Sequence, residues 1–189
     1  MIKMEMHQGV DATKIADYSV GGNMKNQISA KISKWLAIEE VSAHCDIPCG
    51  IYDPHQAQIA ALTVIRMIDL MNGLFKDHKE HDLEFKNSLS RYIAVKEEHA
   101  ELCKHEIRVI WGDYIKPAHL EKHPQLHELT HKIMQLGSKC RQTANRDTAL
   151  ELLKAVNEFA AIFWATKGLE TKTVKAPYPP SEDIITPIL

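Results

Sequence analysis

Apolar residues at helical spacing, repeated in four segments, constrain the fold of this chain more than any other feature. Such stripes predict helices over about 54–72, 82–114, 124–136 and 145–167. Short links join the four segments, and no stretch shows the alternating pattern of a strand. We therefore predict an all-α protein, an up-and-down four-helix bundle in which each stripe is buried against the others.

Local signals mark where these helices begin and end. Asp53 is an N-cap candidate and Pro54 suits the first helical position. Gly73, Gly137 and Gly168 follow the first, third and fourth stripes, and glycine commonly ends a helix. We therefore expect the first helix to stop near Asn72-Gly73 and the third at Gly137.

The composition is that of an ordinary globular protein. The chain has 189 residues, of which 44% are hydrophobic and 25% charged, and its formal net charge is −2. The near-neutral charge shows no excess of basic residues of the kind that would indicate nucleic acid as a partner. No run of 18 apolar residues is present, so we predict no transmembrane helix and no membrane partner.

The segment before the bundle has the features of a removable leader. An amphipathic helix is expected over about 24–40, and it is too charged to be the apolar region of a secretory signal. Small residues at Val41-Ser42-Ala43 nevertheless suit a processing peptidase that cuts after Ala43. We predict a leader over 1–43, a loop over 44–53, the bundle over 54–168, and a cytoplasmic location.

The last segment, 169–189, is predicted to be an extended C-terminal tail. Four prolines interrupt it. We expect a frayed end, with the alternative that four apolar residues dock on a neighbour: Ile184, Ile185, Ile188 and Leu189.

The loop HCDIPCGIYDP gathers metal-binding groups in a segment that cannot be regular. Cys45 and Cys49 are four residues apart across Pro48, and Gly50 follows to allow a turn. This arrangement brings both sulfurs to one point. Thiolates are soft ligands, and planar sites that include nitrogen suit Cu(II) or Ni(II).

A cut after Ala43 would complete this donor set. His44 would become the N-terminal residue, with a free α-amino group. That amine, the amide nitrogen of Cys45 and the two thiolates would form a planar set of two nitrogens and two sulfurs. The ring of His44 could add an axial bond, and such a site suits a metal that cycles by one electron.

This loop resembles the nickel hook of nickel-type superoxide dismutases, whose motif is HCDxPCGxYDP. The similarity continues through KEEHAELCKHEIRVIWGDYIKPAHLEKHPQLHEL and the pair Phe163-Trp164, and it covers roughly residues 44–168. The resemblance implies a homohexamer of four-helix bundles with one nickel ion per subunit. It also implies disproportionation of superoxide to O2 and H2O2 by Ni(II)/Ni(III) cycling.

The resemblance assigns roles to individual residues. It implies that His44, Cys45 and Cys49 are the nickel ligands and that Asp46 helps to hold the loop. Tyr52 would stand over the open face of the metal, with Tyr114 as a second tyrosine nearby. Lys116 could help to attract the anionic substrate. Relatives have a Glu and an Arg that position the axial ring of His44, and Ala60 and His99 stand at those two places here. His99 is therefore a candidate to hold that ring.

Two other functions remain open for the same loop. A non-redox nickel or zinc protein would use Cys45, Cys49 and His44 without any cut. A thiol–disulfide module would cycle the two cysteines as a dithiol, although CxxxC is not the CxxC spacing of thioredoxin-like proteins. Cys103 and Cys140 lie in helical segments, where we expect small buried side chains.

A second group of candidate metal ligands is a histidine stripe: His119, His123, His127 and His131 recur every four residues. Pro124 interrupts any single helix through them, so we interpret them as surface residues. Glu128 and His131 match half of a di-iron bundle motif, but a second copy is missing.

Overall fold

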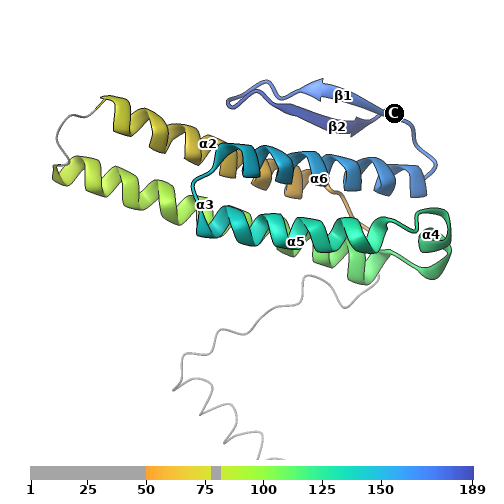
Figure 1. The fold of residues 1–189 in the computed structure, drawn as a ribbon. Coiled ribbons are helices and arrows are strands. Elements are labelled where there is room, and N and C mark those ends of the chain that lie inside the picture. The colour runs from red at the N-terminus through yellow and green to blue at the C-terminus, as the bar shows by residue number, and fades with distance from the viewer. Residues whose placement is uncertain (1–49, 78–81) are drawn as a thin grey trace, which may run out of the picture. The chain divides into compact units, whose positions relative to one another are not determined.

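Four long helices lie side by side in the computed structural model, which describes residues 50–77 and 82–189 (Figure 1). They are α2 (His55–Asp77), α3 (Leu83–Val109), α5 (Leu126–Gln142) and α6 (Arg146–Thr166). Each packs against two others in the order α2, α3, α5, α6 and back to α2. The prediction of a mainly helical protein is confirmed.

The core lies between these four helices. Apolar side chains from all of them are fully buried there, including Ile65, Ile107, Ile133, Leu152 and Phe159. Each fully buried side chain of this size contributes about 1.5–3 kcal/mol. By length and composition alone α2 is apolar enough to cross a membrane, and part of its apolar surface, including Ile65 and Ile68, is buried in this core.

The helix starts follow the sequence signals closely. Asp82 caps α3 by accepting a hydrogen bond from the backbone N–H of Phe85, and Asn145 caps α6 by accepting one from Thr148. Asp53 accepts a hydrogen bond from the N–H of His55 at 2.8 Å where α2 begins. Each bond satisfies an N–H that the helix itself leaves unpaired.

Two predicted helix ends are wrong. α2 continues through Asn72-Gly73 to Asp77, and α5 continues through Gly137 to Gln142. An interior glycine costs only about 1 kcal/mol, and tertiary packing overrides that preference. Phe75 packs edge-on against Phe85 of α3 with ring centroids 4.9 Å apart, which holds the last turns of α2 in place.

The link between α3 and α5 contains two short elements that the sequence did not predict. The helix widens into a π-helical turn, η1 (Ile110–Tyr114), and the chain then forms α4 (Pro117–Lys122). A π turn rotates the residues that follow it relative to the preceding helix, and such turns are frequent at functional sites. Here it ends at Tyr114.

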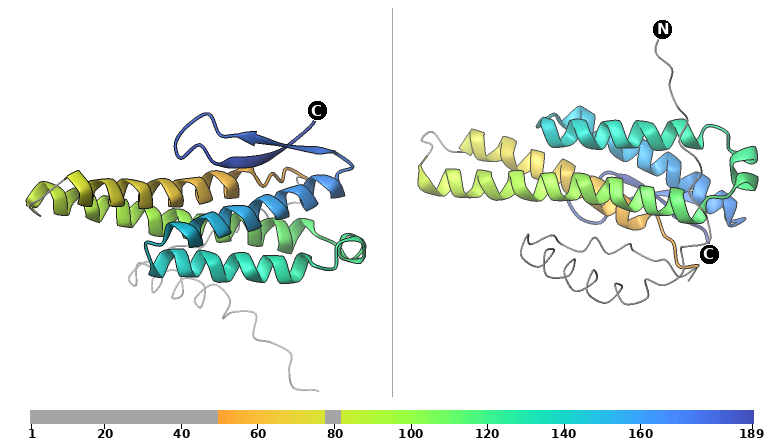
Figure 2. Two further views of the ribbon diagram at one scale, coloured as in Figure 1. Left: turned by 45° about the horizontal axis from the view of Figure 1, so that its top comes forward. Right: turned by 90° about the horizontal axis from the view of Figure 1, so that it is seen from below.

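The prediction of a frayed tail is wrong. Residues 171–187 form an antiparallel hairpin of β1 (Thr171–Lys175) and β2 (Asp183–Pro187) that lies along α2 and α6 (Figures 1 and 2). Ile184 is buried in the core of its own chain; docking of the tail on a neighbour stays a prediction. Side-chain contacts with the helices, rather than strand propensity alone, stabilise this short hairpin.

Candidate metal centre

The structure describes the last part of the predicted nickel loop, from Gly50 onward. Gly50 has a φ angle of +74°, the left-handed conformation that glycine adopts without strain. Ile51 is exposed and Tyr52 is half-buried. His44, Cys45, Asp46 and Cys49, with the leader and its cut site, lie outside the described residues.

Tyr52 and Tyr114 meet, as the sequence comparison with the hook motif implied. Their ring centroids are 5.5 Å apart, with an interplanar angle of 44°. The two residues come from the segment before α2 and from η1, which are distant in sequence. Tyr52, which belongs to the hook motif, therefore lies beside Tyr114.

The hydroxyl of Tyr114 has a defined hydrogen-bonding direction. It lies 2.9 Å from Thr166 Oγ1, and that hydroxyl lies 2.6 Å from the carbonyl oxygen of Phe163. A carbonyl can only accept, so Thr166 donates its single proton to Phe163. Tyr114 must then donate to Thr166, and the lone pairs of its own oxygen remain available as acceptors.

A cation and two further rings surround Tyr114. Lys167 Nζ lies 4.5 Å from the Tyr114 ring centroid, a cation–π distance. The ring centroid of Phe163 lies 5.0 Å from that of Tyr114, and the ring of His119 stacks on Tyr114 with a centroid distance of 5.2 Å and an interplanar angle of 22°. This cluster holds the tyrosine ring rigidly at the end of α6.

Sequence reasoning missed Thr166 and Lys167 as site residues. A spacing signal was available, because positions three and four residues after Phe163 share its helix face. The packing of Tyr114 on that face could not be predicted from the sequence, because η1 and α6 are distant along the chain.

Lys116 and His119 are linked through the start of α4. The backbone N–H of Lys116 donates to His119 Nδ1 at 3.2 Å, so the neutral ring of His119 carries its proton on Nε2. Lys116 is exposed, and its Nζ donates to the carbonyl oxygen of Asp113 at 2.8 Å. The positive charge of Lys116 is therefore held at the backbone of Asp113, the residue that precedes Tyr114.

His99 lies farther along α3. Its Nδ1 is 2.9 Å from the carbonyl oxygen of Val95, one turn earlier in the same helix. Fifteen residues separate it from Tyr114, about 20 Å along a helix axis. Ala60 is fully buried in α2. The role of His99 near the axial ring stays a prediction.

The other candidate ligands do not gather into a metal site. Cys103 and Cys140 are free and buried, as predicted. His127 Nδ1 accepts the indole N–H of Trp111 at 3.2 Å. Within residues 50–77 and 82–189 no group of three or more His, Cys, Asp or Glu side chains is arranged to hold a metal ion.

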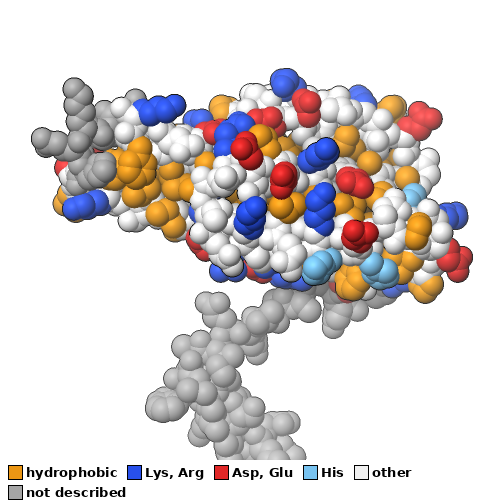
Figure 3. Space-filling view, in the orientation of Figure 1, with side chains coloured by type: hydrophobic (Ala, Val, Ile, Leu, Met, Phe, Trp, Pro, Cys, Tyr) orange, Lys and Arg blue, Asp and Glu red, His pale blue; other side chains and the backbone are white. Residues whose placement is uncertain are grey.

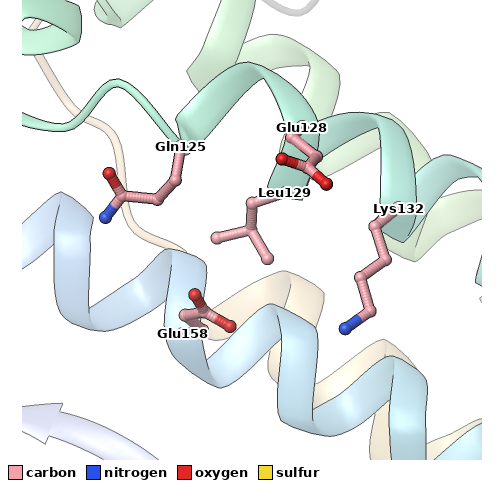
Figure 4. Close-up of a pocket in the computed structure, with 5 residues that line it drawn as sticks. All are labelled: Gln125, Glu128, Leu129, Lys132 and Glu158. Carbon is pink, nitrogen blue, oxygen red and sulfur yellow. The ribbon is translucent and has the colours of Figure 1, made fainter.

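A shallow polar depression between α5 and α6 has a volume of about 170 Å³ (Figure 4). Glu158 of α6 faces Glu128 and Lys132 of α5 across it, with Leu129 between them. Its two carboxylates disfavour an anionic substrate. On the face shown in Figure 3, acidic and basic side chains are interspersed.

Comparison with known proteins identifies the family. Residues 39–167 match the family of nickel-containing superoxide dismutases. The chain belongs to this family. Superoxide dismutase [Ni] of Streptomyces coelicolor is 39% identical over 127 residues, covering 67% of this chain and 90% of the relative. That of Streptomyces seoulensis is 38% identical over 128 residues, covering 68% and 91%.

Solved structures of nickel superoxide dismutase share the fold. The native structure at 1.30 Å has a TM-score of 0.58 and 38% identity, and it aligns with 66% of this chain and 99% of its own. An apo structure has a TM-score of 0.56 and 35% identity, with coverages of 63% and 99%. The family match ends at residue 167, before β1 begins.

The chemistry of the loop fits nickel. Two thiols, an imidazole and a potential N-terminal amine form a nitrogen and sulfur donor set of the kind that suits Ni(II) in a planar site. Tyr52 follows Gly50 and Ile51 in the sequence and packs on Tyr114. Nothing in the described residues conflicts with a metal held at the end of this loop.

Proposed function

We propose that the active form of this nickel superoxide dismutase begins at His44, after a peptidase removes residues 1–43. The enzyme converts two superoxide ions and two protons into O2 and H2O2. The observation that carries the proposal is the motif HCDIPCGIYDP, whose Tyr52 packs on Tyr114 with ring centroids 5.5 Å apart. The nickel ligands would be His44, Cys45 and Cys49.

The chain's own residues perform four tasks in this proposal. Asp46 helps to hold the ligand loop in its folded form. Tyr52 and Tyr114 restrict access to a small anion and order water beside the centre, because the Tyr114 oxygen keeps its lone pairs for water. His119 and Lys167 fix the Tyr114 ring. Lys116 adds positive charge at the entrance.

When bound, nickel supplies a one-electron couple between Ni(II) and Ni(III). Anionic thiolate and amide donors favour the higher oxidation state and so lower a potential that would otherwise be out of reach. Superoxide is small and needs little binding energy, so an open site with nearby positive charge suits it. A large substrate cavity is not required.

The wider assembly is also part of the proposal. The four long helices would be the up-and-down four-helix bundle of one subunit in a homohexamer, with one nickel ion per subunit. We also propose a cytoplasmic location, because segment 24–40 is too charged to be the apolar region of a secretory signal. Residues 1–43 would keep the ligand set incomplete until the peptidase acts.

Native intact mass of protein from cells supplied with nickel and the peptidase tests this proposal, together with superoxide dismutation. We expect a subunit that begins at His44 and carries one nickel, in a hexamer, with activity that disappears on nickel removal. A full-length chain that binds nickel or zinc without dismutation would instead establish a non-redox metal-binding protein. Reversible oxidation of Cys45 and Cys49 without metal would establish a thiol–disulfide module.

A further inference from the structure

The C-terminal hairpin is attached to the helices through two amide side chains. Gln58 Nε2 of α2 donates to Asn157 Oδ1 of α6 at 2.9 Å and to the carbonyl oxygen of Ile185 at 3.0 Å. Asn157 Nδ2 donates to the carbonyl oxygen of Asp183 at 2.8 Å. Gln58 and Asn157 therefore bond to each other, and each also bonds to β2.

These contacts fix the register of the hairpin. The carbonyl of Glu182 points toward β1, because it accepts from the N–H of Ala176 at 3.0 Å. Carbonyls alternate in direction along a strand, so those of Asp183 and Ile185 point away from β1, toward the helices. A slip of one residue would turn them away from both amides. The hairpin is thus docked in one defined position.

Gln58 connects this docking to the metal loop. It is only 1% exposed, and both of its amide hydrogens are used. Its backbone N–H donates to the carbonyl oxygen of Pro54 at 3.2 Å, so it lies in the first turn of α2. Asp53 and Tyr52 directly precede that turn and lead back to Cys49.

We propose that the C-terminal hairpin positions the nickel loop, with Gln58 as the positioning residue that joins them. This inference rests on the proposed function. Tyr52 fixes the loop base on Tyr114, and Gln58 fixes the next turn of chain on α6 and β2. A loop whose base is held at two points loses less freedom when it closes around a metal, which slows release of the metal.

A second junction between the same three elements provides a matched control. Arg146 of α6 donates to Asp69 Oδ1 of α2 at 2.8 Å and to Glu182 Oε1 at 2.7 Å. Asp69 lies eleven residues after Gln58, three helical turns or about 16 Å farther from the loop. Removing the Asp69 carboxylate breaks the bond between α2 and Arg146, but it leaves the bond of Arg146 to Glu182 and the contacts of Gln58 with α6 and β2 in place.

The test compares Gln58→Leu with Asp69→Asn in the processed, nickel-loaded enzyme. Nickel release to excess EDTA is followed at a temperature where circular dichroism shows every variant fully folded. We expect Gln58→Leu to release nickel about tenfold faster than the wild type, since two neutral hydrogen bonds are lost. Its oxidised nickel EPR spectrum should broaden. Asp69→Asn should lower Tm and leave both readouts unchanged.

Equal release rates and spectra in the wild type and Gln58→Leu would overturn the inference and leave the hairpin a purely stabilising element. Faster release in Asp69→Asn as well would also overturn it, because the effect would then be general loosening. If Gln58→Leu does not fold, Ile184→Asp decides in its place. This change puts a carboxylate where the side chain is buried in β2, and so undocks the hairpin without altering α2.

The wild-type measurement separates this inference from the function on which it rests. A processed wild-type chain that holds nickel and dismutates superoxide, with unchanged release in both Gln58→Leu and Ile184→Asp, contradicts the positioning role alone. A processed wild-type chain that takes up no nickel contradicts the proposed function, and the positioning role with it.

Discussion

Tyr114 shows how one residue acquires a functional orientation from its hydrogen bonds. The hydroxyl of Thr166 donates its hydrogen bond to the carbonyl oxygen of Phe163, so it can only accept a hydrogen bond from Tyr114. Thr166, at the end of α6, thereby orients the hydroxyl of Tyr114, although Thr166 has no proposed catalytic role. The orientation rests on two hydroxyls and one carbonyl.

Replacing Thr166 with valine should remove this orientation while keeping the side-chain shape. We expect the free energy of unfolding to fall by about 0.5–1.5 kcal/mol, the usual contribution of a hydrogen bond. Tyr114→Phe should cost a similar amount. Because both changes break the same bond, the double variant should cost little more than either one. Chemical denaturation checks this, and full additivity would show that the bond contributes nothing.

Cys140 links burial to the pH dependence of stability. Burial raises the pKa of its thiol from 9.0 to about 11. The folded state therefore holds this proton more tightly than the unfolded state. The resulting stability is complete below about pH 9 and is lost as the pH rises toward 11.

The measurement is unfolding by denaturant at several pH values in the wild type and in Cys140→Ala. Other groups titrate in the same range, so the difference between the two proteins is the relevant quantity. We expect the variant to be less stable at pH 8, because its core has lost a side chain. The gap should narrow by about 1–2 kcal/mol by pH 11. A constant gap would mean that the thiol does not titrate differently in the fold.

Residue-level chemistry was predictable where it is local in sequence. The donors His44, Cys45 and Cys49 stand in one short segment, so their types and spacing could be interpreted directly. Thr166 and Lys167 could not be found in this way, because their importance depends on which side chain packs against α6. The same holds for Gln58, which in sequence is an ordinary polar residue of an amphipathic helix.

At the scale of elements, the C-terminal end of α5 is held by a side chain of another helix. Lys96 of α3 is buried, and its Nζ donates to the carbonyl oxygens of Cys140, Arg141 and Thr143 at 2.6, 2.7 and 3.1 Å. The last carbonyls of a helix have no partner within it. A lysine charge also interacts favourably with the negative end of the helix dipole.

Lys96→Met should therefore destabilise the protein strongly. The three carbonyls would lose a charged donor inside the protein, and we expect a loss of about 2–4 kcal/mol. Lys139→Met is the matched control, since Lys139 is an exposed lysine near the same helix end. It should change stability by less than about 0.5 kcal/mol. Thermal and denaturant unfolding of both variants check this, and similar losses would contradict the capping role.

The helix ends show the limit of prediction for elements. Asp82 and Asn145 cap α3 and α6 close to the predicted starts of these helices, because an N-cap is a local interaction. Gly137 did not end α5, since its missing side chain makes room for Lys104, whose Cγ would lie 2.6 Å from an added Cβ. The hairpin was missed because its pairing and docking depend on Gln58 and Asn157, which are far away in sequence.

At the scale of the whole molecule, charge must act locally. The net charge of −2 slightly repels an anion at long range, and the face seen in Figure 3 mixes both signs. Screening limits such interactions to about 8–10 Å at ordinary ionic strength. We therefore expect Lys116 and Lys167, which lie near Tyr114 in the sequence or in space, to attract superoxide.

Lys116→Glu tests this local attraction against Lys86→Glu. Both changes alter the net charge equally, but Lys86 lies in the first turns of α3, at the end opposite η1 and Tyr114. We expect kcat/KM for superoxide to fall about threefold to tenfold at low salt in Lys116→Glu, and hardly at all in Lys86→Glu. Pulse radiolysis over a range of ionic strengths measures kcat/KM, and the difference in kcat/KM between the two variants should disappear as salt screens the site.

Equal losses of kcat/KM in the two variants would instead show that net charge governs the encounter. An unaffected Lys116→Glu enzyme would remove this lysine from the path of the substrate and leave Lys167, already held against the Tyr114 ring, as the cation to replace next.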